Sequence, residues 1–162
     1  MDLIFWRHAQ AHDLSVDVAS NAPDWREADL ARALTPKGQR QAQHMAQWLN
    51  RQLPDTVQIV CSPAVRALAT AQAVGRQVMV DTRLSPTSHL RDLLEVVPWR
   101  ADDACTVVVG HQPTLGQAIA HLIGLQTGDC SVRKGAIWWL RLRMRAGVRE
   151  TVVVSVQAPD LL

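Results

Sequence analysis

The chain contains four short runs that are apolar except for Gln58 and Thr106, at positions 3–6, 57–60, 78–80 and 106–109. None of them alternates with polar residues, as a strand with one exposed face would. Continuous runs of this length are typical of strands that are buried on both faces, as in a parallel sheet. The pattern therefore predicts a mainly parallel central sheet.

Helical spacing appears between these runs. After Thr35, a suitable N-cap residue, and Pro36 at the first helical position, apolar residues recur at i, i+3, i+4 and i+7 up to about Arg51. We predict a second helix over residues 63–75 and a third over about 113–124, each closed by a glycine. Strands that alternate with helices predict an α/β fold, a three-layer sandwich with helices on both faces of the sheet.

The C-terminal part of the chain has the period of a half-exposed strand. Its apolar residues Leu140, Leu142 and Met144 alternate with Arg141, Arg143 and Arg145. We predict an antiparallel hairpin with residues 151–156, closed by a turn at 146–150. The arginines are expected to form the solvent face of an edge strand, and a docking surface for an acidic partner is the alternative.

Residues 11–33 have one weak periodic stretch, many polar residues and Pro23. We predict that they form mainly a long surface loop. Loops of this length inside a compact domain are often functional.

Length and composition fit one globular domain. The 162 residues are 48% hydrophobic and 20% charged, which is ordinary for a folded chain. A net charge of +2, from 17 basic and 15 acidic residues, is too balanced to indicate nucleic-acid binding. No apolar run approaches the roughly 18 residues of a membrane span, and the first residues do not form a signal peptide. We expect a cytoplasmic protein that binds neither nucleic acid nor membrane.

The cysteines and the remaining histidines do not indicate a metal site. Three cysteines are widely spaced without a C-x-x-C pair and are expected to be reduced, buried thiols: Cys61, Cys105 and Cys130. His8 and His12 have the spacing of a metal pair, but such a pair belongs on a helix and here follows a strand. His12, His44 and His121 are expected to be structural or at the surface, and Trp48, Trp99, Trp138 and Trp139 to pack in the core or at an edge.

Polar residues follow three of the predicted strands. The groups are Arg7-His8, the segment from Cys61 to Arg66 that includes Ser62, and Gly110-His111. Because the carboxyl ends of parallel strands form the crevice where α/β sheets bind ligands, these side chains are expected to converge.

Two arginines beside two histidines suit phosphoryl transfer. Arginine binds phosphate through paired N–H donors, and neutral histidine is a competent nucleophile. Arg66 falls in the first turn of the second helix, where a cation is unfavourable unless an anion lies nearby. A dianionic phosphoryl group is the matching ligand.

These residues resemble the histidine phosphatase superfamily, also called phosphoglycerate mutase-like. Its Arg-His pair after the first strand is similar to Arg7-His8, and its Ser-Pro-x-x-Arg-Ala-x-x-Thr segment is similar to residues 62–70. Its late histidine resembles His111, and its Leu-Thr-x-x-Gly-x-x-Gln-Ala stretch resembles residues 34–42. Four motifs in the family's order make the signal specific, and they span residues 3 to about 120.

The short chain resembles the SixA branch, the phosphohistidine phosphatases, because only about 45 residues separate Arg66 from His111. The resemblance implies a single histidine phosphatase domain over residues 1–162. It implies that His8 accepts the phosphoryl group, that Arg7 and Arg66 hold it, and that His111 stabilises the transferring oxygens. Ser62 is included among the substrate-binding residues.

The resemblance further implies a metal-independent phosphatase without cofactors, acting on a phosphorylated protein or a small phosphorylated metabolite. A histidine phosphotransfer or kinase domain is the expected protein partner. The oligomeric state stays open, with a monomer favoured.

The proton donor is not fixed by the sequence. Many family members have Gly and Glu where this chain has Ala9 and Gln10. Candidate donors are His89, Asp92 and Glu95, none in a diagnostic context. A phosphoester needs its leaving group protonated more than a phosphoimidazole does, so we predict a phosphohistidine phosphatase. The alternatives are a phosphatase for small phosphoesters and a non-catalytic phosphoprotein-binding module.

Overall fold

The computed structural model describes residues 1–14, 24–97, 104–126 and 128–161. Its central element is a six-stranded sheet in the order β3-β2-β4-β1-β5-β6. The strands are β1 (Asp2–Arg7), β2 (Gln58–Cys61), β3 (Met79–Val80), β4 (Cys105–Gly110), β5 (Ile137–Arg145) and β6 (Val148–Gln157). The first four pair in parallel, and β5 pairs antiparallel with both β1 and β6. The predicted mainly parallel sheet is confirmed. The expected burial on both faces is wrong for β3, an edge strand whose two residues are exposed.

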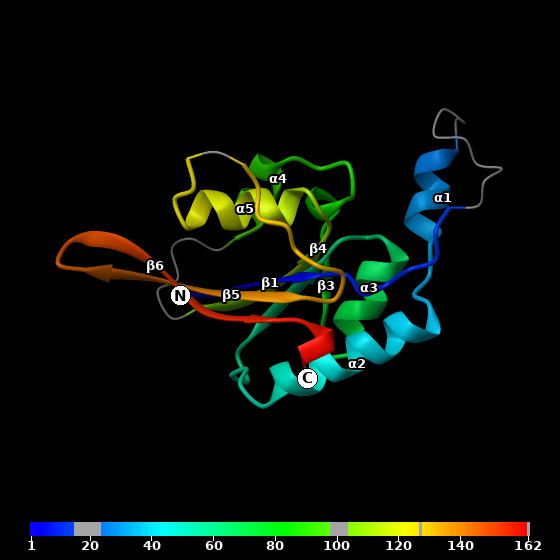
Figure 1. Cartoon of the computed structure of the whole chain (residues 1–162), viewed down its shortest axis with the longest axis horizontal. Coiled ribbons are helices and arrows are strands. Elements are labelled where there is room, and N and C mark those ends of the chain that lie inside the picture. Colours follow the sequence, from blue (N-terminus) through cyan, green and yellow to red (C-terminus); the bar gives the residue numbers. More distant parts are fainter. Residues whose placement is uncertain (15–23, 98–103, 127, 162) are drawn as a thin grey trace.

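Helices cover both faces of this sheet (Figure 1). The helices α2 (Pro36–Asn50) and α3 (Val65–Gln72) lie on one face, and α4 (Leu90–Val96) and α5 (Thr114–Leu122) lie on the other. Strand β1 contributes side chains to both hydrophobic cores. Ile4 and Trp6 pack on the side of α2 and α3, and Leu3 and Phe5 pack on the side of α4 and α5. The three-layer sandwich predicted from the sequence is confirmed.

The helix boundaries follow local chemistry. The hydroxyl of Thr35 accepts a hydrogen bond from the Gly38 N–H at 3.0 Å and so caps α2 as predicted. Helix α3 begins at Val65, two residues after the predicted Pro63, because the backbone of Ala64 is still extended. Helix α4 was not predicted, since its seven residues give too short a pattern.

Residues 11–33 were predicted to form mainly a loop, and this is wrong for their second part. Residues Trp25–Ala31 form the helix α1, which has no fully buried residue. A surface helix of two turns with so little apolar burial leaves almost no periodic signal. The rest of this segment, residues 15–23, and Trp99 lie outside the described residues.

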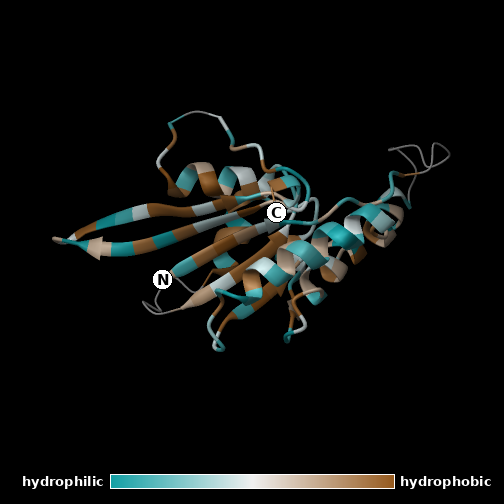
Figure 2. Cartoon of the chain, turned by 60° about the horizontal axis from the view of Figure 1, so that its bottom comes forward, coloured by the Kyte–Doolittle hydropathy of each residue, from teal (hydrophilic) through white to brown (hydrophobic). Residues whose placement is uncertain are grey.

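The C-terminal hairpin is confirmed and projects from the sheet at the end opposite to α1 (Figures 1 and 2). Its turn is shorter than the predicted 146–150, because β6 already begins at Val148. The arginines of β5 are exposed as predicted, and Arg141 and Arg143 pair with Asp2 and Glu150. Strand β5 is not an edge strand, however, because β6 lies outside it. Most apolar residues of the hairpin lie in the half that is nearest to the rest of the sheet (Figure 2).

The remaining side chains behave largely as predicted. Cys61 and Cys105 are buried, whereas Cys130 is only partly buried. Trp48 and Trp139 pack edge to face in the core, with ring centroids 6.5 Å apart. Among the described residues, no helix has the length and apolar character needed to cross a membrane.

Candidate active site

Three strand ends bring the predicted site together. His8 follows β1, Ser62 follows β2 and His111 follows β4, and β4 lies between the other two strands. The main chain ties these ends to each other, because the His8 N–H donates to the carbonyl of Gly110 at 3.1 Å and the Ser62 N–H to that of Val109 at 3.0 Å. His8, Ser62, Arg66 and His111 are all buried there.

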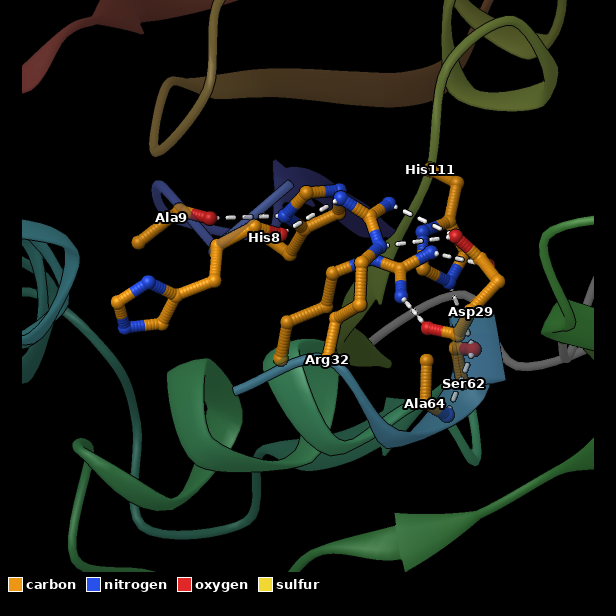
Figure 3. A network of polar contacts seen from close by, with 9 residues as sticks. His8, Ala9, Asp29, Arg32, Ser62, Ala64 and His111 are labelled. Atoms are coloured by element: carbon orange, nitrogen blue, oxygen red, sulfur yellow. Dashed lines mark hydrogen bonds and ion pairs between the residues drawn. The ribbon is translucent and has the colours of Figure 1, made fainter. Parts of the chain in front are cut away.

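The imidazole of His8 is held in one tautomer. Its Nδ1 lies 2.8 Å from the carbonyl oxygen of Ala9 (Figure 3). A carbonyl oxygen can only accept, so Nδ1 carries the proton and donates it. The lone pair of the ring is therefore on Nε2, the nitrogen available for attack.

Burial keeps His8 uncharged. Desolvation, with the nearby positive charges of Arg66, Arg7 and Arg32, lowers the pKa of His8 to about 3, although the hydrogen bond to Ala9 opposes the shift. At neutral pH the side chain is consequently an unprotonated imidazole, the form that a nucleophile needs.

His111 faces His8 and is bound to Ser62. The two rings have centroids 5.1 Å apart and are tilted by 53°. The Nε2 of His111 lies 2.7 Å from the Oγ of Ser62, which also accepts a hydrogen bond from the Ala64 N–H at 3.2 Å. Burial, then the charges around it, lowers the pKa of His111 to about 2. The predicted charge partner is thus neutral before a ligand arrives, and an incoming dianion would raise its pKa.

The two predicted phosphate-binding arginines are each held by a terminal nitrogen, while the Nε is left without a hydrogen-bond partner in the described part of the chain. Arg7 donates from one terminal nitrogen to the carbonyl of Val132 at 2.7 Å, and both terminal nitrogens of Arg66 are bound to Asp29. The Nε of each guanidinium is buried and has no hydrogen-bond partner in the part of the chain that the structure describes. A buried N–H without a partner costs about 1–3 kcal/mol, which an anionic ligand would recover.

Asp29 and Arg32 are site residues that the sequence did not single out. They come from α1 and the residue after it, and they lie beside His8 and His111 (Figure 3). The carboxylate of Asp29 forms ion pairs of 2.8 Å with both Arg66 and Arg32. Arg66 lies in the first turn of α3, where a cation is unfavourable without a nearby anion. Asp29 supplies such an anion from the same chain. A 37-residue separation between Asp29 and Arg66 gave no sequence signal.

The segment 34–42 supports the loop that carries His8. Gln10, two residues after His8, accepts from the Thr35 N–H at 3.0 Å and donates its own N–H to Gln41 at 3.1 Å. Gly38 packs so closely that a Cβ on it would lie 1.9 Å from the carbonyl oxygen of Gln10. This motif therefore packs against the backbone that follows His8.

Thr70 joins the same loop to Arg66. Its buried hydroxyl accepts from the Ala9 N–H at 3.1 Å and donates to the carbonyl of Arg66 at 2.7 Å. The last residue of the Ser62-to-Thr70 motif thus links the two sides of the pocket.

The three candidate proton donors are not brought to the histidines by any described contact. Asp92 accepts a hydrogen bond from the His89 N–H at 2.8 Å, which caps α4 and lowers the pKa of its carboxyl. Glu95 is 65% exposed and lies 4.0 Å from Arg83, and His89 is exposed. Within the described residues, none of the three bonds to Arg7, His8, Arg66 or His111.

Neutral histidines lie beside arginines at the carboxyl edge of the parallel sheet, the arrangement that the sequence predicted for binding a phosphoryl group. The chain belongs to the histidine phosphatase superfamily, because residues 3–95 match its branch 1. An uncharacterised protein from Picosynechococcus sp. is 33% identical over 149 residues, which cover 87% of this chain and 85% of that protein.

Further similarities are to SixA proteins. A phosphohistidine phosphatase SixA homolog from Haemophilus influenzae is 27% identical over 139 residues, covering 76% of this chain and 78% of the homolog. The structure of a putative phosphohistidine phosphatase SixA from Nakamurella multipartitia has 27% identity and a TM-score of 0.73, and covers 98% of this chain and 95% of its own.

The structure of the protein histidine phosphatase SixA complexed with tungstate has 24% identity and a TM-score of 0.76, over 99% of this chain and 98% of its own, and confirms the fold. The predicted phosphoglycerate mutase-like fold and the SixA branch are confirmed, and the matches support a phosphatase.

Proposed function

We propose that this protein is a phosphohistidine phosphatase that transfers the phosphoryl group to the Nε2 of His8 and then to water. The observation that carries the proposal is the tautomer of His8. Its Nδ1–H is bound to Ala9 at 2.8 Å, and burial holds the ring neutral, so that an Nε2 lone pair lies beside two arginines with unpaired Nε–H groups. A pocket that only bound phosphate would not need such a nucleophile.

In the first step, the lone pair of His8 Nε2 attacks phosphorus in line. A bond forms from phosphorus to Nε2 as the bond from phosphorus to the substrate's ring nitrogen breaks. Arg7, Arg66 and His111 bind the phosphoryl oxygens. Their donors are fixed in place before the reaction, which is the main means by which proteins accelerate phosphoryl transfer.

In the second step, water attacks phosphorus and the bond to Nε2 breaks. The electron pair of that bond returns to Nε2, and the hydrogens of the water leave with the phosphate. His8 keeps the proton on Nδ1 throughout, because the Ala9 carbonyl holds it there. The enzyme therefore returns to its starting tautomer without a further proton transfer.

The environments of two carboxylates support the proposed substrate class. Burial opposes the shift, but ion pairs with two arginines lower the pKa of the Asp29 carboxyl. Asp92 caps a helix. Both carboxylates accept hydrogen bonds in their ionised form and so have no proton to donate. A phosphohistidine protonated on its other ring nitrogen leaves as neutral imidazole, so it needs no acid at the leaving atom, whereas an alkoxide does. Similarity to SixA proteins supports the same substrate class.

Metal independence belongs to this proposal. The predicted phosphate-binding groups are guanidinium and imidazole side chains, which supply positive charge and N–H donors directly. The same proposal takes a phosphorylated protein as the partner and the cytoplasm as the site of action, and it treats residues 1–162 as one catalytic domain.

The proposal is tested by comparing two substrates. We expect kcat/KM for a phosphohistidine peptide to exceed that for an alkyl phosphoester such as phosphoserine, whose leaving group is an alkoxide, by at least an order of magnitude. His8→Ala should abolish turnover of both. His12→Ala is the matched control, since it removes an exposed histidine four residues away and should leave turnover intact. A higher kcat/KM for the ester would favour a small-phosphoester phosphatase. Turnover by His8→Ala would exclude His8 as the nucleophile.

A further inference from the structure

Arg66 is held by one residue of α1. Its two terminal nitrogens donate to two different atoms of Asp29, one to the backbone carbonyl oxygen and the other to Oδ2 at 2.8 Å. Two bonds from one planar guanidinium to one residue fix both its position and its rotation. They occupy only the terminal edge of the guanidinium, and its buried Nε keeps an unpaired N–H.

Asp29 is fixed in turn by Arg32. The Nε and a terminal nitrogen of Arg32 lie 2.9 and 2.8 Å from Oδ1, so the two oxygens of the carboxylate serve two arginines. The other terminal nitrogen of Arg32 donates to the carbonyl of His12 at 2.9 Å. The side chain of Asp29 is 13% exposed and that of Arg66 2%. These burials make the pair less screened by water than an ion pair at the surface.

From these contacts we infer that Asp29 is a positioning residue, which holds the guanidinium of Arg66 by its terminal edge so that the Nε edge binds the transferring phosphoryl group. This inference rests on the proposed function. Asp29 needs no contact with the substrate, because it acts through Arg66. A carboxylate this close to a phosphate site would otherwise only repel the ligand, and Arg32 offsets that charge.

The experiment is a double-mutant cycle with Asp29→Asn and Arg66→Gln, read out as kcat/KM for a phosphohistidine peptide and as the dissociation constant of inorganic phosphate. Asp29→Asn keeps the size of the side chain but removes its charge. We expect kcat/KM to fall on the order of 10- to 100-fold, the scale of a misplaced binding group. Phosphate should bind about tenfold more weakly, since the binding group is Arg66.

In the Arg66→Gln background, Asp29→Asn should change either quantity less than about twofold, because the residue through which Asp29 acts is gone. Asp29→Glu, which keeps the charge, should recover part of the activity. Glu27→Gln is the control, as it removes an exposed carboxylate from the same helix and should leave both quantities unchanged.

Three results would overturn the inference. Equal losses from Asp29→Asn in both backgrounds would mean that it does not act through Arg66. Unchanged kcat/KM in Asp29→Asn would mean that it positions nothing. Tighter phosphate binding in Asp29→Asn would make it a competitor of the ligand. If Arg66→Gln does not fold, the single variants decide, because a purely structural role would lower the melting temperature without weakening phosphate binding.

The wild-type protein separates this inference from the proposed function. If it neither hydrolyses the peptide nor binds phosphate, the proposed function fails. If it does both and the cycle is additive, only the role of Asp29 fails.

Discussion

The imidazoles of His8 and His111 lie with their centroids 5.1 Å apart in a buried pocket, and burial lowers the pKa of both, to about 3 and about 2. In the unfolded chain histidine titrates near 6.5, so below that pH the unfolded state binds more protons than the native state. The free energy of unfolding should therefore decrease as the pH falls from 7 toward 3. At pH 5 the loss is about 2 kcal/mol for each of the two histidines.

Urea unfolding at pH 7 and pH 5 checks this for the wild-type protein and for His111→Gln. The variant should lose about 2 kcal/mol less than the wild-type protein over that interval, since one histidine no longer titrates. The other titrating groups are common to both proteins and cancel in the comparison. An identical loss in the two proteins would show that His111 is not held neutral.

Thr70→Val tests the link between the loop after His8 and Arg66. The substitution leaves the Ala9 N–H without its acceptor in a buried place. We expect a loss of about 1–3 kcal/mol in the free energy of unfolding, the cost of an unpaired buried donor. Because Thr70 also binds the Arg66 carbonyl, kcat/KM should fall as well. Denaturant titration and steady-state kinetics measure the two effects.

Thr106→Val is the matched control. Thr106 is buried to a similar degree, but its hydroxyl oxygen has no hydrogen-bond partner in the described part of the chain. Replacing an unsatisfied hydroxyl by a methyl group should be neutral or stabilising. If both variants lose equal stability, the volume change and not the hydrogen bonds of Thr70 explains the effect.

Gly38→Ala should destabilise the protein although alanine is the better helix former. Helix propensity alone favours alanine over glycine by about 1 kcal/mol. Here the new Cβ would lie 1.9 Å from the carbonyl oxygen of Gln10, a backbone atom two residues after His8. The melting temperature and kcat/KM should both fall. Lys37→Ala, at the exposed neighbouring position, serves as the control, and a stabilised Gly38→Ala protein would disprove the close approach.

The sequence predicted those parts of the site that depend on strands. Buried parallel strands have a continuous apolar pattern, so the positions of His8, Ser62 and His111 at strand ends followed directly. The two cores were also predictable, because apolar positions of α2, α3 and α5 recur at helical spacing.

The contribution of α1 was not predictable in the same way. Its seven residues bury no side chain completely, so no apolar stripe marks it. The unfavourable place of Arg66 in the first turn of α3 did indicate a nearby anion. That anion includes Asp29 of the same chain, and only the tertiary structure brings the two together. The proton donor stays a prediction, and of its three candidates Asp92 caps α4.

Activity should survive removal of divalent metals. If arginines and histidines alone bind the phosphoryl oxygens, prolonged dialysis against EDTA should leave kcat/KM for a phosphohistidine peptide unchanged within about twofold. Inactivation that added Mg²⁺, Mn²⁺ or Zn²⁺ reverses would contradict this part of the proposal. Inactivation without recovery would instead be checked by circular dichroism for loss of fold.

Trapping the phosphorylated intermediate tests most directly whether His8 is the nucleophile. The protein would be mixed rapidly with a ³²P-labelled phosphohistidine peptide, quenched without acid, and digested to locate the label. If His8 is the nucleophile, label should appear transiently on His8, at rates of formation and loss that match turnover. His8→Ala should carry no label, and His12→Ala should be labelled like the wild-type protein. Turnover without label on His8, or label on another residue, would contradict it.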